Sequence, residues 1–137
     1  MIRSKALRLI DANLNRAKEG LRVAEDLIRF FYDDRSLTVA FKRLRHDCTK
    51  AILEFPVPYR TLIRHRESGK DVGRKSRIAG KKKPNWKDIL ISNLKRTEES
   101  FRVLEEAAKV IAPRKSARFQ AMRFQLYELE KRALGKF

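Results

Sequence analysis

A polar pattern suited to binding phosphate occurs twice in the sequence, 80 positions apart. Residues 13–26 and 93–106 are identical at seven of fourteen positions and share the pattern N-L-x-R-x-x-E-[GS]-[LF]-R-V-x-E-[DE]. Most of the identities are polar, whereas a repeat kept only for packing would be expected to keep its apolar positions. Arginine donates charge-assisted, often bidentate hydrogen bonds to phosphate oxygens. The repeat therefore indicates a duplicated fold and a candidate site for an anionic ligand.

The candidate site residues occupy equivalent positions in the two copies, so we expect the site where the copies meet. At about 100° per residue, Arg16 and its equivalent Arg96 lie beside the apolar stripe of their helices. These two are the first candidates for phosphate contacts and for catalysis. Residues three apart differ by about 60° around a helix, so not every candidate can face one ligand. The wider set of predicted binding residues is Asn13, Arg22, Arg45, Asn93 and Arg102.

Two acidic residues of the repeat fall close to the apolar stripes themselves. Glu25 and Glu105 would be buried there, and a buried carboxylate requires a partner. Arg45 and Arg123 flank the stripes of the helices expected to pack against them. We favour buried ion pairs with a structural role for these acids, and part of a ligand site remains the alternative.

Helical periodicity predicts the elements that position these side chains. Apolar residues recur at three- and four-residue steps over residues 7–28 and 41–55, and no alternating run is long enough for a convincing strand. The predicted fold class is all-α, a four-helix bundle built from two repeated helical hairpins at residues 3–55 and 86–134, forming one domain over 1–137. The expected boundaries are caps at Ser36 and at Asn85 with Asp88, stops at Pro56 and Pro113, and a last helix from Ser116 to Leu134.

A long basic loop, residues 55–85, connects the two hairpins. It holds three of the four prolines, three of the five glycines and the basic run Lys81-Lys82-Lys83. Loops of this length within compact domains are usually functional or disordered. The segment 65–73 mixes glycines, acids and cations in a way that could wrap phosphate, and a plain surface linker is the equally simple alternative.

Composition and charge limit the classes of partner. The chain of 137 residues is 42% hydrophobic and carries 34 Lys+Arg against 17 Asp+Glu, a net charge of +17. This surplus favours anionic partners, and a charge-rich surface that only confers solubility is the alternative. The single cysteine, Cys48, excludes an intramolecular disulfide and suits a reducing compartment. Cationic residues near the start and the lack of an apolar run of ~18 residues predict no signal peptide, no membrane partner and a cytoplasmic location.

Five ordered motifs resemble a known family over essentially the whole chain. They are DANLNRAKEGLRVAED, LRHD at 44–47, KDVG at 70–73, SNLKRTEESFRVLEE and MRFQLYELEK. Together they resemble the small single-function hydroxymethylpyrimidine-phosphate kinases of bacterial thiamin biosynthesis, which stand alone or are fused ahead of thiamin-phosphate synthase. The sequence carries no synthase barrel, so the stand-alone form is expected. One departure is Arg66-Glu67-Ser68, where members of the family more often carry Arg-Asp-Thr.

The resemblance implies a phosphotransferase that uses ATP and Mg²⁺. It would transfer a phosphoryl group to 4-amino-5-hydroxymethyl-2-methylpyrimidine phosphate and give the diphosphate. The basic surplus suits this reaction, because ATP and a phosphomonoester together carry about six negative charges. In the loop that shares the resemblance, Asp71 is predicted to hold Mg²⁺ and serve catalysis, while Lys70 and the backbone around Gly73 contact the ATP phosphates.

Two other classes of function remain as alternatives. A basic helical module that binds nucleic acid would suit the net charge of +17. Against it, the repeated acids Glu19, Glu25, Glu99 and Glu105 lie among the arginines that such a surface would present. A structural helical adaptor is the other alternative, favoured if the polar repeat is only an ion-pair lattice. The sequence leaves open a homo-oligomer and which copy binds which substrate.

Overall fold

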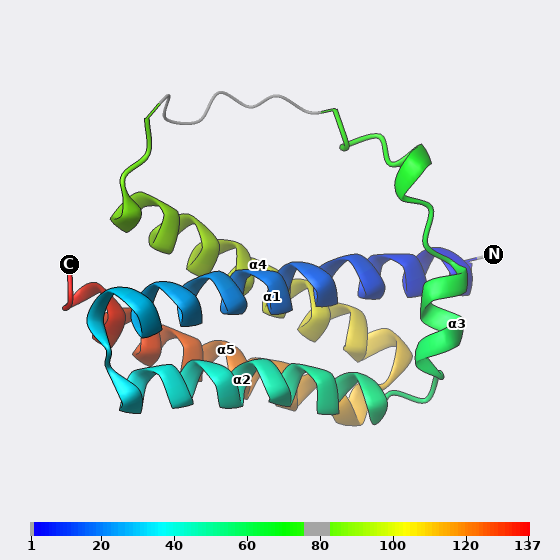
Figure 1. The fold of residues 1–137 in the computed structure, drawn as a ribbon. Coiled ribbons are helices and arrows are strands. Elements are labelled where there is room, and N and C mark those ends of the chain that lie inside the picture. The colour runs from blue at the N-terminus through cyan, green and yellow to red at the C-terminus, as the bar shows by residue number, and fades with distance from the viewer. Residues whose placement is uncertain (1, 76–82) are drawn as a thin grey trace.

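The computed structural model describes residues 2–75 and 83–137, and within them it contains helices and no strand. This agrees with the predicted all-α class. Lys81 and Lys82 of the predicted basic run lie outside the described residues. The helices follow one another as α1 (Ile2–Tyr32), α2 (Arg35–Leu53), α3 (Tyr59–Arg64), a 3₁₀ turn (Ser68–Lys70), α4 (Trp86–Ile111) and α5 (Pro113–Leu134) (Figure 1).

The structure differs from the predicted helices in three places, two helix ends and one additional short helix. Asp34, not Ser36, caps α2, because its carboxylate accepts the backbone N–H of Leu37 at 2.9 Å. α5 begins at Pro113 rather than Ser116, since proline lacks an N–H that the first helical turn would leave unsatisfied. The connection predicted as a loop includes the short helix α3. At α4 the predicted capping box is present, with Asn85 and Asp88 bonding to each other's backbone N–H.

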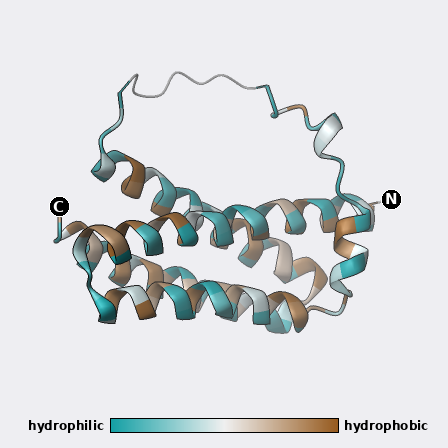
Figure 2. Cartoon of the chain, viewed as in Figure 1, coloured by the Kyte–Doolittle hydropathy of each residue, from teal (hydrophilic) through white to brown (hydrophobic). Residues whose placement is uncertain are grey.

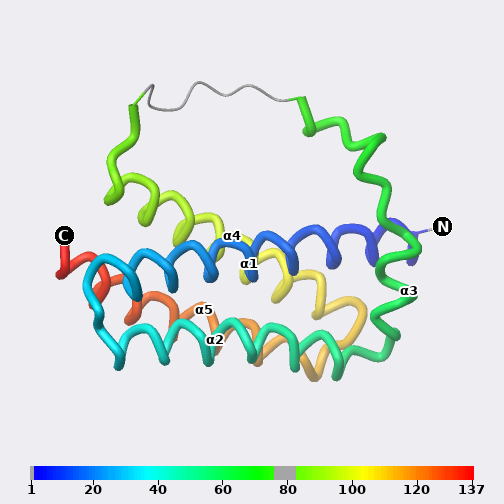
Figure 3. Tube along the Cα trace, viewed as in Figure 1, coloured from blue at the N-terminus to red at the C-terminus, as the bar shows by residue number. Residues whose placement is uncertain are grey.

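The four long helices pack as two hairpins placed against each other. α1 lies on α2 and α5 lies on α4, while α1 also crosses α4 and α2 contacts α5 (Figure 3). α3 packs against α1 near its N-terminal end (Figure 3). Each copy of the repeat therefore contributes one helix to the central crossing of α1 and α4.

Buried apolar residues of the four long helices form one core cluster. Hydrophobic and hydrophilic residues alternate along each of these helices (Figure 2). The buried core runs through all four long helices and includes Phe41, Phe101 and Phe119. Cys48 belongs to this core, and burial raises the pKa of its thiol to about 12, as expected of a packing residue rather than a nucleophile. Within the described residues, no helix has the length and apolar character to cross a membrane.

The two hairpins are held together internally by equivalent ion pairs. Arg45 Nε donates to Glu25 Oε2 at 2.9 Å, and Arg123 donates to Glu105 Oε2 at 2.8 Å. Both carboxylates are buried, so each needs this partner to offset its lost hydration. The predicted pairing is confirmed, and its occurrence in both copies supports two related hairpins.

The crossing of α1 and α4 is close because one residue there is glycine. A Cβ at Gly20 would lie 2.2 Å from Thr97 Oγ1 and 2.8 Å from the carbonyl oxygen of Asn93. Thr97 Oγ1 donates to that same carbonyl at 3.0 Å, and its residue is fully buried. The copy in α4 carries Ser100 at the position equivalent to Gly20, so the two sides of the crossing are not identical.

Replacing this glycine should weaken the fold. We expect Gly20→Ala to lower the free energy of unfolding by about 1–3 kcal/mol through overpacking, although alanine favours helix. Urea unfolding followed by circular dichroism measures the loss, and Gly69→Ala, where a Cβ meets nothing within 4 Å, is the control. Adding Thr97→Ala should restore part of the loss. Equal stability of Gly20→Ala and the wild type would contradict the close crossing.

Lys95, Glu98 and Glu130 form a polar cluster between α4 and α5. Lys95 Nζ lies 3.4 Å from Glu98 Oε1 and 2.9 Å from Glu130 Oε1. Desolvation, together with hydrogen bonding to and repulsion by Glu130, raises the pKa of Glu98 to about 7. Burial opposes ionisation of Glu130, but hydrogen bonds to Glu98 and Lys95 outweigh it and lower its pKa. The Oε2 atoms of both acids are buried without a hydrogen-bond partner among the described residues, so a proton on Glu98 that is shared with Glu130 would satisfy them.

The raised pKa of Glu98 predicts a pH-dependent stability. The stabilisation that Glu98 provides is present below its ordinary pKa of 4.5 and is lost as pH rises through about 7. Glu98→Gln cannot ionise, so its free energy of unfolding should fall less than that of the wild type between about pH 5 and pH 8. Urea titrations across this range test it, with the exposed Glu128→Gln as control. Parallel pH profiles for wild type and Glu98→Gln would contradict the shared proton.

Candidate functional site

Two adjoining hollows lie along α1, on the side where it meets α4 and the segment after α3. The crossing hollow, between α1 and α4, has a volume of about 190 Å³. Its lining is Asn13, Arg16, Arg96, Glu99, Ser100 and Val103. The loop hollow, between the N-terminal half of α1 and residues 70–72, is wider, at about 430 Å³. Its lining is Lys5, Arg8, Leu9, Ala12, Asn13, Arg16, Lys70, Asp71 and Val72.

Asn13 and Arg16 border both hollows, so the two spaces meet at these side chains. Asn13 is buried, and its Nδ2 donates to the carbonyl oxygen of Leu9 at 2.9 Å, which fixes the amide. Five residues predicted from the sequence thus come together here, from both copies of the repeat and from the connection: Asn13, Arg16, Arg96, Lys70 and Asp71.

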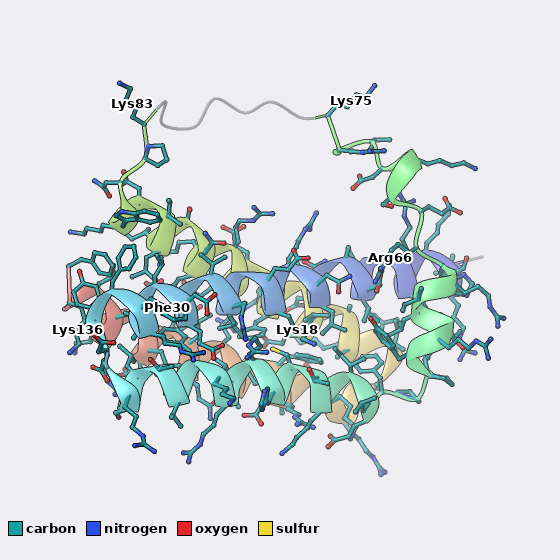
Figure 4. The ribbon with its side chains drawn as sticks, viewed as in Figure 1. Lys18, Phe30, Arg66, Lys75, Lys83 and Lys136 are labelled. Carbon is teal, nitrogen blue, oxygen red and sulfur yellow. The ribbon has the colours of Figure 1, made fainter. Side chains whose placement is uncertain are left out.

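The hollows carry cations that form no ion pair with the described part of the chain. Arg16, Arg96, Lys5 and Lys70 make no side-chain hydrogen bond or ion pair within residues 2–75 and 83–137. The charges of these four side chains are therefore available to a ligand. Lys75 and Lys83 add positive charge on the side of the molecule above α1 and α4 (Figure 4). Anionic groups, phosphates above all, suit such a surface.

A bidentate ion pair ties the segment after α3 to α1. Arg66 Nε donates to Asp11 Oδ2 at 2.6 Å, and Arg66 Nη2 donates to Asp11 Oδ1 at 2.7 Å. Asp11 is buried, and hydrogen bonding to it raises the pKa of Arg66 further above its ordinary value. Arg8 adds a hydrogen bond to the carbonyl oxygen of Glu67 at 3.3 Å. These contacts place residues 70–72 against α1 and so form the wall of the loop hollow.

This anchor was missing from the sequence prediction. Asp11 adjoins the apolar stripe of α1, as Glu25 does, so the reasoning that required a partner for Glu25 would have required one for Asp11. Its partner, 55 residues away in an irregular segment, has no helical spacing that could have identified it.

Asp71 lies at the rim of the loop hollow with an exposed carboxylate. Its Oδ1 accepts the backbone N–H of Gly73 at 2.9 Å, which closes a local turn. No group of three or more His, Cys, Asp or Glu side chains suited to a metal occurs among the described residues. One carboxylate of this kind fits a magnesium ion whose other ligands are phosphate oxygens and water.

Five predicted binding residues lie outside both hollows, and one of them, Gly73, has its backbone N–H engaged by Asp71. Arg22 and Arg102 project from the outer faces of α1 and α4, where each pairs with an acid four residues further along, Asp26 at 3.6 Å and Glu106 at 3.2 Å. Arg45 is held by Glu25, as described above. Asn93 donates to the carbonyl oxygen of Ile89 at 2.8 Å. The structure does not bring these side chains to the ligand space: helical twist turns Arg22 and Arg102 away from Arg16 and Arg96, and Arg45 lies on α2.

Comparison with known proteins identifies the family. The model of the ThiD2 family matches residues 8–132. Three curated relatives are the thiamine-phosphate synthases of Nostoc punctiforme, 35% identical over 129 residues, Synechococcus sp. strain CC9605, 37% over 139, and Synechocystis sp. strain PCC 6803, 36% over 129.

The alignments cover 92–93% of this chain but 34–36% of each relative, so the chain spans about a third of their length. No solved structure matches the chain. The family match extends over both copies of the repeat and over the segment that carries Asp71. The chain therefore belongs to the ThiD2 family, a family of thiamin biosynthesis.

Proposed function

We propose that the chain is a kinase that phosphorylates 4-amino-5-hydroxymethyl-2-methylpyrimidine phosphate with ATP. The observation that carries the proposal is the set of unpaired cations, Arg16, Arg96, Lys5 and Lys70, around two hollows that meet. Two phosphorylated substrates can approach each other only where their mutual repulsion is screened. A pair of adjoining cationic hollows is suited to that task, and it agrees with the kinase family that the sequence motifs resemble.

Phosphoryl transfer to this acceptor requires that the reactants are positioned and their negative charge is neutralised, and it requires no strong base. The acceptor oxygen belongs to a phosphate that is already ionised at neutral pH, so no proton has to be removed from it. Catalysis of phosphoryl transfer comes mainly from holding the reactants in line and from stabilising the charge on the transferred group. Arg16 borders both hollows and can therefore contact acceptor and donor at once.

Magnesium would enter with the nucleotide and take Asp71 as its protein ligand. The exposed carboxylate lies beside Lys70 in the wall of the loop hollow, where a triphosphate would supply further oxygens. Mg²⁺ commonly binds through one or two carboxylates together with substrate phosphates. Its charge would help to neutralise the donor phosphates.

One other activity, the synthase step, can be distinguished from the kinase step by the products that the protein forms. The relatives are named thiamine-phosphate synthase, and that activity belongs to proteins about three times as long as this chain. The purified protein with ATP, Mg²⁺ and the pyrimidine monophosphate should yield ADP and the diphosphate. Failure to form the diphosphate would overturn the proposal, and thiamin phosphate formed from supplied diphosphate and thiazole phosphate would assign the synthase step instead.

Removing either unpaired arginine should impair the reaction. We expect Arg16→Ala and Arg96→Ala each to lower kcat/KM by roughly 10- to 100-fold, since a hydrogen bond to a charged group contributes about 1.5–3 kcal/mol. Arg29→Ala, an exposed arginine near the other end of α1, is the matched control and should keep wild-type kinetics. Unchanged kinetics for both Arg16→Ala and Arg96→Ala would remove these residues from the site.

Asp71→Asn should raise the magnesium requirement. Asparagine keeps an oxygen that can accept the N–H of Gly73, so the local turn is preserved while the negative charge is lost. Turnover measured across a magnesium titration should reach half-maximum at a higher concentration, by about 10-fold or more. Asp47→Asn, in α2 and away from both hollows, is the control. A magnesium profile of Asp71→Asn that overlays the wild type would exclude Asp71 as a ligand.

A further inference from the structure

One carboxylate that lines the crossing hollow makes no contact that would stabilise the fold. Glu99 lines this hollow together with Arg16 and Arg96, yet it forms no hydrogen bond or ion pair with any residue that the structure describes. Other acids of the repeat are used: the buried carboxylates of Glu25 and Glu105 each bind an arginine of the neighbouring helix. An unpaired acid in a hollow that otherwise attracts anions lowers the affinity for phosphate alone. Its presence there indicates a ligand that also offers a hydrogen-bond donor.

The other residues that line the crossing hollow indicate which further chemical groups that ligand carries. Val103 supplies an apolar side chain, against which a flat ring can lie. Ser100 Oγ donates to the carbonyl oxygen of Arg96 at 2.8 Å, so its proton is already engaged. The hollow thus offers two cations, one acceptor carboxylate and one apolar surface within about 190 Å³. An aromatic ring with an amino group at one end and a phosphate at the other matches all of these.

We infer that the crossing hollow is the acceptor subsite and that Glu99 determines its specificity for an aminopyrimidine. This inference rests on the proposed kinase function and assigns the two substrates to the two hollows. Arg16 and Arg96 hold the phosphate of the pyrimidine monophosphate, and the carboxylate of Glu99 accepts a hydrogen bond from its exocyclic amine. The loop hollow, with Lys5, Arg8 and Lys70, is left for the ATP phosphates.

This assignment fixes the transfer step. An oxygen of the acceptor phosphate forms a bond to the γ-phosphorus of ATP, and the bond from that phosphorus to the β,γ-bridging oxygen breaks. ADP leaves with the bond's electron pair, and no proton moves, since the attacking oxygen is ionised. The step takes place where the hollows meet, beside Asn13 and Arg16.

The repeat provides a matched control for Glu99. Glu19 is its equivalent in the first copy, is likewise exposed and unpaired among the described residues, and does not line either hollow. Glu99→Ala and Glu19→Ala change the net charge by the same amount. A difference between them therefore reports a local contact rather than the long-range attraction of the whole molecule for anions.

Calorimetric titration with two ligands tests the inference. One ligand is the pyrimidine monophosphate, and the other is the same molecule with hydrogen in place of the amino group. The wild type and Glu19→Ala should prefer the amino ligand by about 10-fold or more, because a site that hydrogen-bonds an N–H rejects an analogue that lacks it. In Glu99→Ala the ratio should fall towards one, while the deaminated analogue binds as tightly as before or more tightly.

The outcomes separate the inference from the proposed function. If the wild type binds neither ligand but retains its helical circular dichroism, the kinase proposal itself fails. If the wild type binds the pyrimidine monophosphate and Glu99→Ala keeps the wild-type preference for the amino group, the kinase proposal stands and the role of Glu99 is overturned. An equal loss of preference in Glu19→Ala also overturns it.

Discussion

The close approach of α1 to α4 is the constraint on which the rest of the molecule depends. It brings Gly20 against Thr97 with no space for a side chain at position 20. The same contact places the exposed flanks of the two helices side by side, so that Arg16 and Arg96 come to line one hollow. Packing and binding are thus two results of a single helix crossing.

The chain separates its many charges into paired and unpaired sets. Buried acids such as Asp11, Glu25 and Glu105 each hold an arginine by a short hydrogen bond, and this holds the hairpins and the segment after α3 in place. Four cations around the hollows, Lys5, Arg16, Lys70 and Arg96, have no partner among the residues that the structure describes. Structural arginines are satisfied within the fold, and the remaining arginines and lysines are available for anionic ligands.

The helical hairpins and the buried ion pairs could be predicted because both follow from spacing. Apolar stripes and capping residues gave the long helices to within a few residues, and a carboxylate in a stripe required the arginine that the structure shows. The loop hollow could not be predicted, because it depends on Arg66 reaching Asp11 from an irregular segment. The repeat pattern also made Arg22 and Arg102 binding candidates beside Arg16 and Arg96, although helical periodicity set them on another face and local ion pairs hold them there.

The near-symmetry of the crossing has a consequence for how such a site can arise. A hairpin with one apolar stripe cannot bury it alone, and two identical hairpins crossing at α1 and α4 would form a symmetric dimer with twin arginines at its axis. The two halves of a symmetric site bind a phosphoryl donor and a phosphoryl acceptor equally well. Joining the copies in one chain lets each side change separately, as glycine at position 20 and serine at position 100 already have. Duplication followed by divergence thus converts a symmetric anion site into one whose two sides can bind different substrates.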